Sequence, residues 1–394
     1  MRDAYIVTAI RTPGCKQARG AFSQTRPEEL ASFILKSAVE QTPNLDPAAI
    51  DDVMLGCAFP EAEQGANMGR IIAKKAGLPD SVTGATVNRF CSSGLEAIAL
   101  ASLRVMSGWS DVVVGAGAES MSTVPMGGNN RRPDPVLSRT TDGDLYLSMG
   151  LTAENVANRY NISREQQDEF ACSSHMKAID AQKKGLFTEI VPTPATKFVK
   201  QANGTYAKET FIQSVDDGVR PGTTVEGLGK LRPVFAKNGS VTAGNSSQTT
   251  DGAAVSIIVS EKTLKEFDLT PIAKVRCYTT AGCKADEMGV GPKYAIPKLL
   301  KIAGLKIEDI GLFELNEAFA SQAIYCANEL DLDMKKVNIN GGAIALGHPL
   351  GCTGAKLCAT LLANMKRLGV KYGIESMCMA GGMGAAALFE LCDE

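Results

Sequence analysis

The residue types best suited to chemistry in this sequence are cysteine and histidine. The chain has 11 cysteines but only 2 histidines, His175 and His348. A cysteine thiolate is a nucleophile, and histidine is the side chain whose ordinary pKa best suits a general base near neutral pH. Eleven thiols cannot all pair within one chain, and none has the Cys-x-x-Cys spacing of a zinc or redox motif. We therefore expect reduced thiols, no metal site and a cytosol-like compartment.

Cys91 stands in the segment NRFCSSG (88–94), where a loop runs into a helix with apolar positions from Leu95 onward. Free backbone N–H groups at a helix start favour negative charge, so this position predicts a stabilised thiolate. A buried, unreactive thiol is the alternative, because most free cysteines pack as small hydrophobes. Position alone supports the two interpretations equally.

His348 lies in the segment GGAIALGHPLGCTG (341–354), a glycine-rich turn before a helix. Glycines let the backbone approach a substrate closely. The turn continues as Ala355-Lys356 and lacks the Gly-Lys-Ser/Thr ending of a phosphate loop. We expect His175, on a predicted helix, to be structural or solvent-facing. His348 is then the one histidine placed to act as a base, unless its ring is merely satisfied by the backbone of the turn.

Two further segments carry polar or reactive residues. Cys378 ends an apolar strand in MCMAGGMG (377–384), and position alone slightly favours packing as a small hydrophobe. Asn316, in ELNEAFA (314–320), follows a strand and opens a helix, so it is predicted to cap that helix. Together these residues indicate a cysteine nucleophile with His348 as its base, plus a second thiol. The residues by themselves indicate nothing more specific.

The elements that must position these residues alternate between apolar strands and amphipathic helices. Strands are predicted at 4–10, 53–56, 111–115, 253–259 and 376–379, and helices over 28–41, 95–106, 151–184 and 294–303. This alternation predicts an α/β fold. The segment 46–56 also resembles 305–313, and similar elements flank each copy, which indicates two related α/β halves. A chance likeness between two α/β units is the alternative.

Residues 119–250 differ from both halves by their prolines and by the polar run GGNNRR (127–132). We predict an inserted loop domain over 119–250, an N-terminal half made of 1–118 and 251–270, and a C-terminal half over 271–394. The insertion is mildly basic, which would suit an anionic ligand, but an ordinary solvated loop explains its charge equally well.

The overall charge and the terminal segments argue against several classes of protein. The formal net charge is -2, which does not favour nucleic-acid binding, and no apolar run approaches the 18 residues of a membrane span. The first residues, MRDAYIV, do not resemble a signal peptide, and the last, ELCDE, are not a peroxisomal Ser-Lys-Leu tail. We therefore expect a cytoplasmic protein of bacterial type.

The four segments, taken together and in this order, resemble the motifs of the thiolase family. NRFCSSG (88–94) resembles the nucleophile motif, NEAF (316–319) the Asn-Glu-Ala-Phe motif, and GGAIALGHP (341–349) the Gly-His-Pro motif. The segment that begins at Cys378 resembles Cys-x-Gly-x-Gly. The likeness covers nearly the whole chain. It implies a thiolase-like fold of two duplicated α/β halves in α-β-α-β-α layers, with an inserted loop domain that binds CoA.

The resemblance also implies a reaction. A thiolase of degradative type cleaves 3-ketoacyl-CoA with CoA to acetyl-CoA and a shortened acyl-CoA, as in fatty acid β-oxidation. His348 would deprotonate Cys91, which would carry the acyl group, and Cys378 would act as acid and base. His348 and a water held by Asn316 would form one oxyanion hole, and the backbone N–H groups of Cys91 and Ala380 the other. CoA would be a substrate, so no cofactor is implied.

Two positions depart from the family pattern. Ala380 replaces a glycine, which questions both its backbone angle and the room for an acyl chain beside Cys91. The segment SMG (148–150) replaces the His-Met-Gly of short-chain biosynthetic thiolases, which favours a degradative enzyme of broader chain length. Residues that match CoA-contacting positions of the family are Arg220, Ser247, Met149, Met288, Ala318 and Phe319.

Three alternatives remain at this stage. An acetyl-CoA acetyltransferase would run the same chemistry on short chains. A decarboxylating ketoacyl synthase shares the doubled fold but needs a second catalytic histidine, and His175 is badly placed for it. A non-catalytic acyl-CoA binder would not need all four motif residues. The resemblance further implies a homo-oligomer, either a dimer or a tetrameric dimer of dimers, and it leaves association with other β-oxidation enzymes open.

Overall fold

Short apolar segments form one ten-stranded sheet at the centre of the computed structural model. The structure describes residues 1–393, except the side chains of 141–143, so the end of the predicted C-terminal half at 394 lies outside the described residues. The strands of the sheet are β1 (Ala4–Arg11), β2 (Cys15–Lys16), β3 (Asp52–Gly56), β4 (Thr83–Val87), β5 (Val112–Ser120), β8 (Thr250–Ser260), β9 (Ala273–Gly282), β10 (Leu312–Leu315), β11 (Tyr372–Met379) and β12 (Met383–Leu391).

The sheet consists of two similar parts that meet at β1 and β9. One part has the order β4-β3-β5-β8-β1 and the other β9-β12-β11-β10. In each part the strands at the outer edge pair in parallel, as in β3–β5 and β10–β11, and the strands nearer the junction pair antiparallel, as in β5–β8 and β12–β9. The two parts are joined by only two residue pairs, Tyr5 with Lys274 and Ile6 with Ala273. The short junction lets each part carry its own layers of helices.

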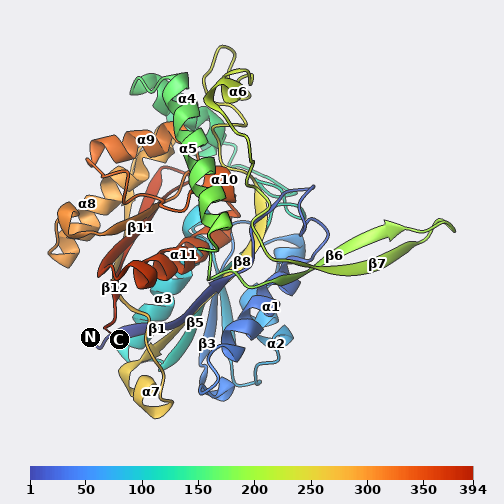
Figure 1. Cartoon of the computed structure of the whole chain (residues 1–394), viewed down its shortest axis with the longest axis vertical. Helices are drawn as coiled ribbons and strands as arrows, with labels where there is room; N and C mark the ends of the chain where they lie inside the picture. The colour runs from blue at the N-terminus through green and yellow to red at the C-terminus, as the bar shows by residue number, and fades with distance from the viewer. Residues whose placement is uncertain (394) are drawn as a thin grey trace.

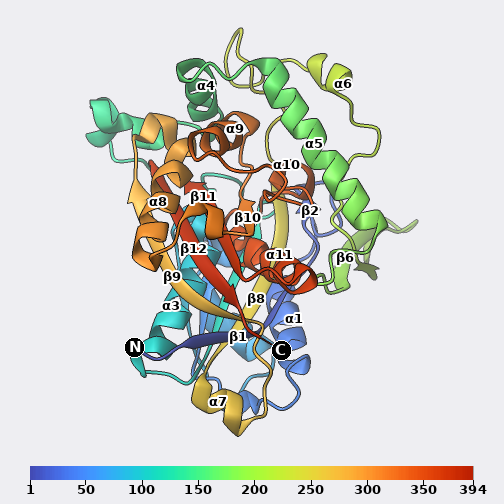
Figure 2. The ribbon, with the colours of Figure 1, turned by 60° about the vertical axis from the view of Figure 1, so that its left-hand side comes forward.

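Helices cover both outer faces and also fill the space between the two parts of the sheet. The helices of the two halves are α1 (Pro27–Glu40), α2 (Met68–Lys75), α3 (Ser93–Ser107), α7 (Glu261–Glu266), α8 (Gly291–Ala303), α9 (Ala320–Glu329), α10 (Ala343–Leu346) and α11 (Thr353–Leu368). α1 and α2 pack on the first part of the sheet and α8 on the second, whereas α3 and α11 contact strands of both parts and each other. This central pair is visible in Figures 1 and 2. The predicted α/β class with α-β-α-β-α layers is confirmed.

The two halves repeat with a constant spacing. β3 begins at residue 52 and β10 at 312, β5 at 112 and β11 at 372, and α3 at 93 and α11 at 353. Each pair is 260 residues apart (312 − 52, 372 − 112 and 353 − 93). The likeness read between 46–56 and 305–313 is therefore a likeness of structure as well as of sequence.

The first turns of α3 and α11 cross at two glycines. A Cβ atom on Gly354 would lie 2.2 Å from the backbone nitrogen of Leu95, and one on Gly94 would lie 2.7 Å from that of Ala355. Such distances leave no room for a side chain, so the two helix starts can meet only through glycine. The crossing therefore brings the turn before α3 close to the turn before α11.

Most of the irregular chain lies between β5 and β8, in residues 121–249 of the region predicted as an insertion. Its elements are α4 (Met149–Arg159), α5 (Arg164–Lys183), β6 (Thr193–Lys200), β7 (Tyr206–Gln213) and α6 (Val225–Gly229). The predicted helical block at 151–184 is two helices, because a new helix begins after Ser163, whose side chain forms a capping box with Gln166. β6 and β7 form a hairpin that projects from the body of the molecule (Figure 1). Within the described residues, no helix is both long enough and apolar enough to span a bilayer.

Candidate active site

Cys91 lies in a single 3-10 turn, Phe90–Ser92, that leads into α3. Its side chain is only 6% exposed. The preceding residue, Phe90, has a φ of +48°, an uncommon angle for a bulky side chain. The Asn88 side chain holds this turn, because its Oδ1 accepts a hydrogen bond from the Phe90 N–H at 2.8 Å. A strained residue next to a reactive one is a frequent feature of functional sites and costs about 1–3 kcal/mol.

Burial raises the pKa of the Cys91 thiol to about 12, although the backbone N–H groups of Cys91 and Ala380 act in the opposite direction. Burial thus opposes the thiolate that the helix start favours, and its effect on this pKa is the larger of the two. The two N–H groups converge on the sulfur, so they also lie close to any acyl oxygen bonded beside it. Ala380 has no positive φ, since those angles fall on Gly381 and Gly382. Alanine thus fits the backbone at this position.

His348 lies two residues before the 3-10 turn Leu350–Cys352, which leads into α11 as the turn of Cys91 leads into α3, and the residue is almost fully buried. Its Nδ1 lies 2.6 Å from Thr353 Oγ1, and that hydroxyl donates to the Pro349 carbonyl at 3.2 Å. The hydroxyl therefore accepts from Nδ1–H, which leaves Nε2 unprotonated. The amide Nδ2 of Asn316 lies 3.4 Å from Nε2 and points a donor at it. The hydrogen-bond network assigns a neutral imidazole whose Nε2 accepts.

Two effects keep this imidazole neutral. Burial, followed by the positive charge of Lys356, lowers the pKa of His348 to about 3. Lys356 is itself buried in the first turns of α11, and its Nζ donates to the Gly347 carbonyl at 3.1 Å. Thr353 and Lys356 are three residues apart, so they lie on one face of the helix and both hold the histidine turn.

The sequence predicted that Asn316 caps a helix, and this prediction is wrong. α9 begins at Ala320 and its N-cap residue is Phe319, so three residues separate Asn316 from the helix. The backbone N–H of Asn316 instead donates to Ser376 of β11 at 2.9 Å. Its side chain is 1% exposed, and its Oδ1 makes no hydrogen bond to any described residue. The sheet and His348 therefore orient the Asn316 amide, and its Oδ1 remains without a hydrogen-bond partner among the described residues.

Cys378, near the end of β11, is fully buried. Burial raises the pKa of this thiol far above its ordinary value, and a thiolate at Cys91 would raise it further. The two thiols are therefore close enough for the charge on one to disfavour the charge on the other. They come from opposite halves of the chain, and the structure brings them together.

Cys378 also packs against most of the residues predicted to contact CoA. The members of this apolar cluster are Met149, Ala153, Val241, Met288, Ala318, Phe319 and Cys378. Ser247 joins it through its backbone N–H, which donates to the Ala318 carbonyl at 2.9 Å.

Arg220 lies apart from the cluster and is exposed. Its backbone N–H donates to Nδ1 of His175, which is buried, so the structural role foreseen for His175 holds and the solvent-facing one is wrong.

An apolar cavity of about 340 Å³ opens beside Cys91. Its lining residues are Phe59, Phe90, Cys91, Met126, Gly127, Arg131, Leu145, Tyr146, Leu147, Ser148, Met149, Leu350 and Ala380. Ala380 forms part of the wall, so its methyl group narrows the cavity without closing it. Residues 126–127 and 145–147 of this wall carry none of the four motifs, so the motifs alone could not define the cavity.

Glu119 is a site residue that the sequence analysis missed. Its buried carboxylate accepts hydrogen bonds from the backbone N–H groups of Ala58 at 2.8 Å and Gly351 at 2.7 Å, and from the Gln64 amide at 2.7 Å. It thereby fastens two cavity-lining segments of opposite halves to β5. Its charge also contributes to the raised pKa of Cys91. Because its partners are distant in the sequence, no local pattern could have revealed this arrangement.

Comparison with known proteins agrees with this geometry. The family model described as "Thiolase, N-terminal domain" matches residues 4–262, and that described as "Thiolase, C-terminal domain" matches residues 269–391. The chain belongs to the thiolase family. It is 49% identical over 393 residues to a 3-ketoacyl-CoA thiolase of Bacillus subtilis (strain 168), with 100% of both chains covered.

More distant relatives and solved structures give the same result. The peroxisomal 3-ketoacyl-CoA thiolase of Homo sapiens is 45% identical, covering 98% of this chain and 91% of the relative. The crystal structure of Bacillus anthracis acetyl-CoA acetyltransferase superimposes with a TM-score of 0.88 at 38% identity, covering 100% of this chain and 99% of the other. Human mitochondrial 3-ketoacyl-CoA thiolase gives a TM-score of 0.88 at 36% identity, covering 99% of each chain.

Proposed function

We propose that this member of the thiolase family cleaves 3-ketoacyl-CoA with CoA, giving acetyl-CoA and an acyl-CoA shortened by two carbons. The observation that carries the proposal is the environment of Cys91. One buried thiol faces an apolar cavity, two backbone N–H groups and a second buried thiol, Cys378. The similarity to full-length relatives named 3-ketoacyl-CoA thiolase supports the same activity.

In the first half of the proposed reaction, Nε2 of His348 takes the thiol proton of Cys91. The sulfur attacks the 3-keto carbon, and the bond between carbons 2 and 3 breaks. Its electron pair stays on the leaving acetyl unit as an enolate, and Cys378 gives that carbon a proton. The proton moves from Cys91 to His348 within the protein, whereas the proton that Cys378 gives is taken up by a carbon of the substrate.

In the second half, the thiolate of Cys378 takes the proton of the CoA thiol, and the CoA sulfur attacks the acyl group on Cys91. The bond to Cys91 breaks, and the leaving sulfur regains its proton from His348. The backbone N–H groups of Cys91 and Ala380 are proposed to hold the acyl oxygen. Asn316, through a water, and His348 are proposed to hold the thioester oxygen of the acetyl unit. Losing one such donor typically costs about 10²–10³-fold in rate.

The proposed CoA site uses the apolar cluster above Cys378. Met149, Met288 and Phe319 would contact the pantetheine arm there together with Ala318, and Ser247 lies at its edge. Arg220, which is exposed and outside the cluster, would meet the phosphates. CoA enters this reaction as a substrate, so the proposal includes no cofactor. We further propose that the protein is a cytoplasmic enzyme of β-oxidation and that it assembles as a dimer or a dimer of dimers.

The degradative assignment is tested by the dependence of kcat/KM on chain length. Burying one more methylene group in an apolar cavity contributes about 0.8 kcal/mol, which corresponds to about fourfold in kcat/KM. We expect kcat/KM to rise from acetoacetyl-CoA through 3-ketohexanoyl-CoA to 3-ketooctanoyl-CoA. A strong preference for acetoacetyl-CoA would instead assign the chain to the acetyl-CoA acetyltransferases.

The roles of the two thiols are tested by a single substitution. In Cys378→Ala, acetoacetyl-CoA should still acylate the protein, and mass spectrometry should find the acyl group on the peptide that contains Cys91. Steady-state turnover should fall by several orders of magnitude, because the second half of the reaction lacks its base. An acyl group on any other peptide would refute the assignment of Cys91, and near-normal turnover would remove Cys378 from the mechanism.

A further inference from the structure

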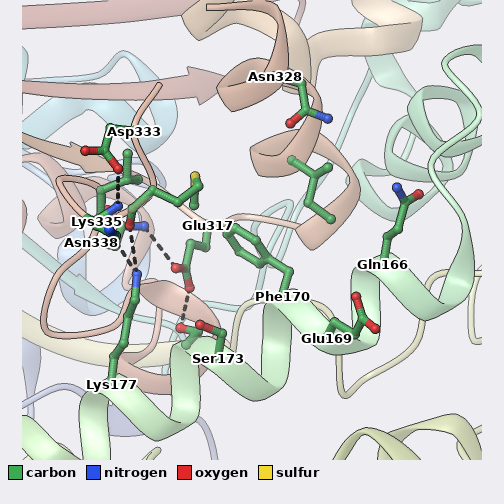
Figure 3. A pocket seen from close by; sticks show the side chains of 14 residues that line it. Gln166, Glu169, Phe170, Ser173, Lys177, Glu317, Asn328, Asp333, Lys335 and Asn338 are labelled. Carbon is green, nitrogen blue, oxygen red and sulfur yellow. Dashed lines mark hydrogen bonds between the residues drawn. The ribbon is translucent and has the colours of Figure 1, made fainter. Parts of the chain in front are cut away.

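A second buried carboxylate, Glu317, lies behind the turns that carry Asn316 and His348. It lines a surface pocket between α5, α9 and the segment 333–338. Figure 3 shows Glu317 reaching between the helix and Asn338. The residue is 2% exposed, and burial raises the pKa of its carboxyl, although the hydrogen bonds that it accepts act in the opposite direction. None of the proposed chemical steps uses it.

Each oxygen of Glu317 is occupied by donors from different segments. Oε1 accepts from Nδ2 of Asn338 at 2.9 Å. Oε2 accepts from the Ser174 hydroxyl of α5 at 2.6 Å and from the Ile344 backbone N–H at 3.2 Å. The Ser174 hydroxyl accepts in turn from the Gly342 N–H at 3.0 Å. One carboxylate thus fastens the turn of Asn316 to α5 and to the glycine-rich segment that continues to His348.

The pattern of donors requires a carboxylate and excludes an amide. Asn338 cannot flip, because its Oδ1 accepts from the Leu315 N–H and its Nδ2 donates to the Leu315 carbonyl, both at 2.8 Å. A glutamine at position 317 would therefore direct its NH₂ group either at Nδ2 of Asn338 or at the N–H of Ile344. Both choices bring two donors together in a buried site.

We infer that Glu317 is a positioning residue for the reaction, and that it acts by setting the contact between Asn316 and His348. Asn316 is its neighbour in the chain, and Ile344 lies four residues before His348 on the segment that Glu317 holds. The contact that depends on both segments is the 3.4 Å approach of Asn316 Nδ2 to His348 Nε2. A displacement of either turn by about 1 Å is enough to cost about 10²-fold in rate. The inference rests on the proposed function.

The test is a kinetic comparison of Glu317→Gln with a matched variant. Glu317→Gln should lower kcat about 10–100-fold, the effect typical of residues that orient groups in a site, with KM for both substrates changed less than about threefold. Glu169→Gln removes the same charge from an exposed residue of the same pocket and should keep wild-type kcat and KM. Ser174→Ala removes one donor to Glu317 and should lower kcat by a smaller factor.

A double-mutant cycle separates positioning from general loosening of the fold. In an Asn316→Ala background the Glu317→Gln change should alter kcat less than about twofold, because the contact that it displaces is already absent. If the two effects multiply, or if Glu317→Gln alone leaves kcat unchanged, the inference is wrong. If Glu317→Gln does not fold, Ser174→Ala in the same cycle decides. An inactive wild-type protein would instead refute the proposed function.

Discussion

The turn before α3 and the turn before α11 occupy equivalent places in the two halves, yet they carry different chemistry. The first carries Cys91 within its 3-10 turn, whereas His348 lies two residues before the 3-10 turn Leu350–Cys352 of the second. In the first turn the hydroxyl of Ser93 bonds to the backbone of the same turn, donating to the Phe90 carbonyl at 2.7 Å and accepting from the Arg89 N–H at 2.8 Å. In the second the equivalent hydroxyl, Thr353, reaches the imidazole ring at 2.6 Å. A duplicated scaffold thus places two helix starts together and leaves each turn free to specialise.

The largest expected effect concerns the position of the nucleophile. Cys91→Ala should abolish formation of the acyl-enzyme and lower kcat by about 10⁴-fold or more, as loss of a covalent nucleophile does. The matched control is Cys352→Ala, which removes the buried cysteine of the other turn and should change kcat less than about threefold. Steady-state thiolysis and mass spectrometry of the acylated protein measure both. If Cys352→Ala is as damaging as Cys91→Ala, the chemistry is not confined to one turn.

The next effect concerns the charge state of Cys91. Because burial raises its pKa to about 12, the thiolate fraction should grow about tenfold per pH unit throughout pH 6–9. Alkylation of the free protein by iodoacetamide, followed on the Cys91 peptide, should therefore accelerate about 10³-fold over this range without a plateau. A short unstructured peptide with one cysteine, whose thiol has an ordinary pKa near 8.5, should level off towards the upper end. A plateau for Cys91 below pH 8 would mean that the helix-start amides prevail over burial.

A methyl group added at the crossing of α3 and α11 should destabilise the protein by an amount that depends on which of the two glycines receives it. Gly354→Ala places a Cβ atom 2.2 Å from a backbone nitrogen, so a helix must shift. We expect the free energy of unfolding to fall by about 3 kcal/mol, with a smaller loss for Gly94→Ala, where the closest atom is 2.7 Å away. Urea denaturation measures both. Gly229→Ala, which meets nothing within 4 Å, is the control, and equal stability of Gly354→Ala and this control would contradict the packing argument.

The sequence was informative where the cause is local. Alternating apolar segments predicted the strands and helices, and the likeness of 46–56 to 305–313 predicted the repeat of the halves. Prediction from the sequence failed where contacts between residues distant in the chain determine the structure. The helix start at Cys91 suggested a thiolate, but the surroundings that bury the sulfur come from other segments. Asn316 was predicted to cap a helix, whereas the sheet and His348 hold it outside the helix.

The smallest expected effects belong to the two equivalent hydroxyls, and they should differ in kind. Thr353→Val keeps the shape of the side chain but leaves Nδ1–H of His348 without its acceptor, so the ring can turn or change tautomer. We expect kcat to fall about 10–30-fold with KM nearly unchanged, and Thr353→Ser to restore most of the loss. Ser93→Ala, in contrast, removes only turn bonds, so it should lower the free energy of unfolding by about 1 kcal/mol. If Thr353→Val lowers stability but leaves kcat intact, the hydroxyl serves the turn in both halves, and the assigned tautomer of His348 loses its support.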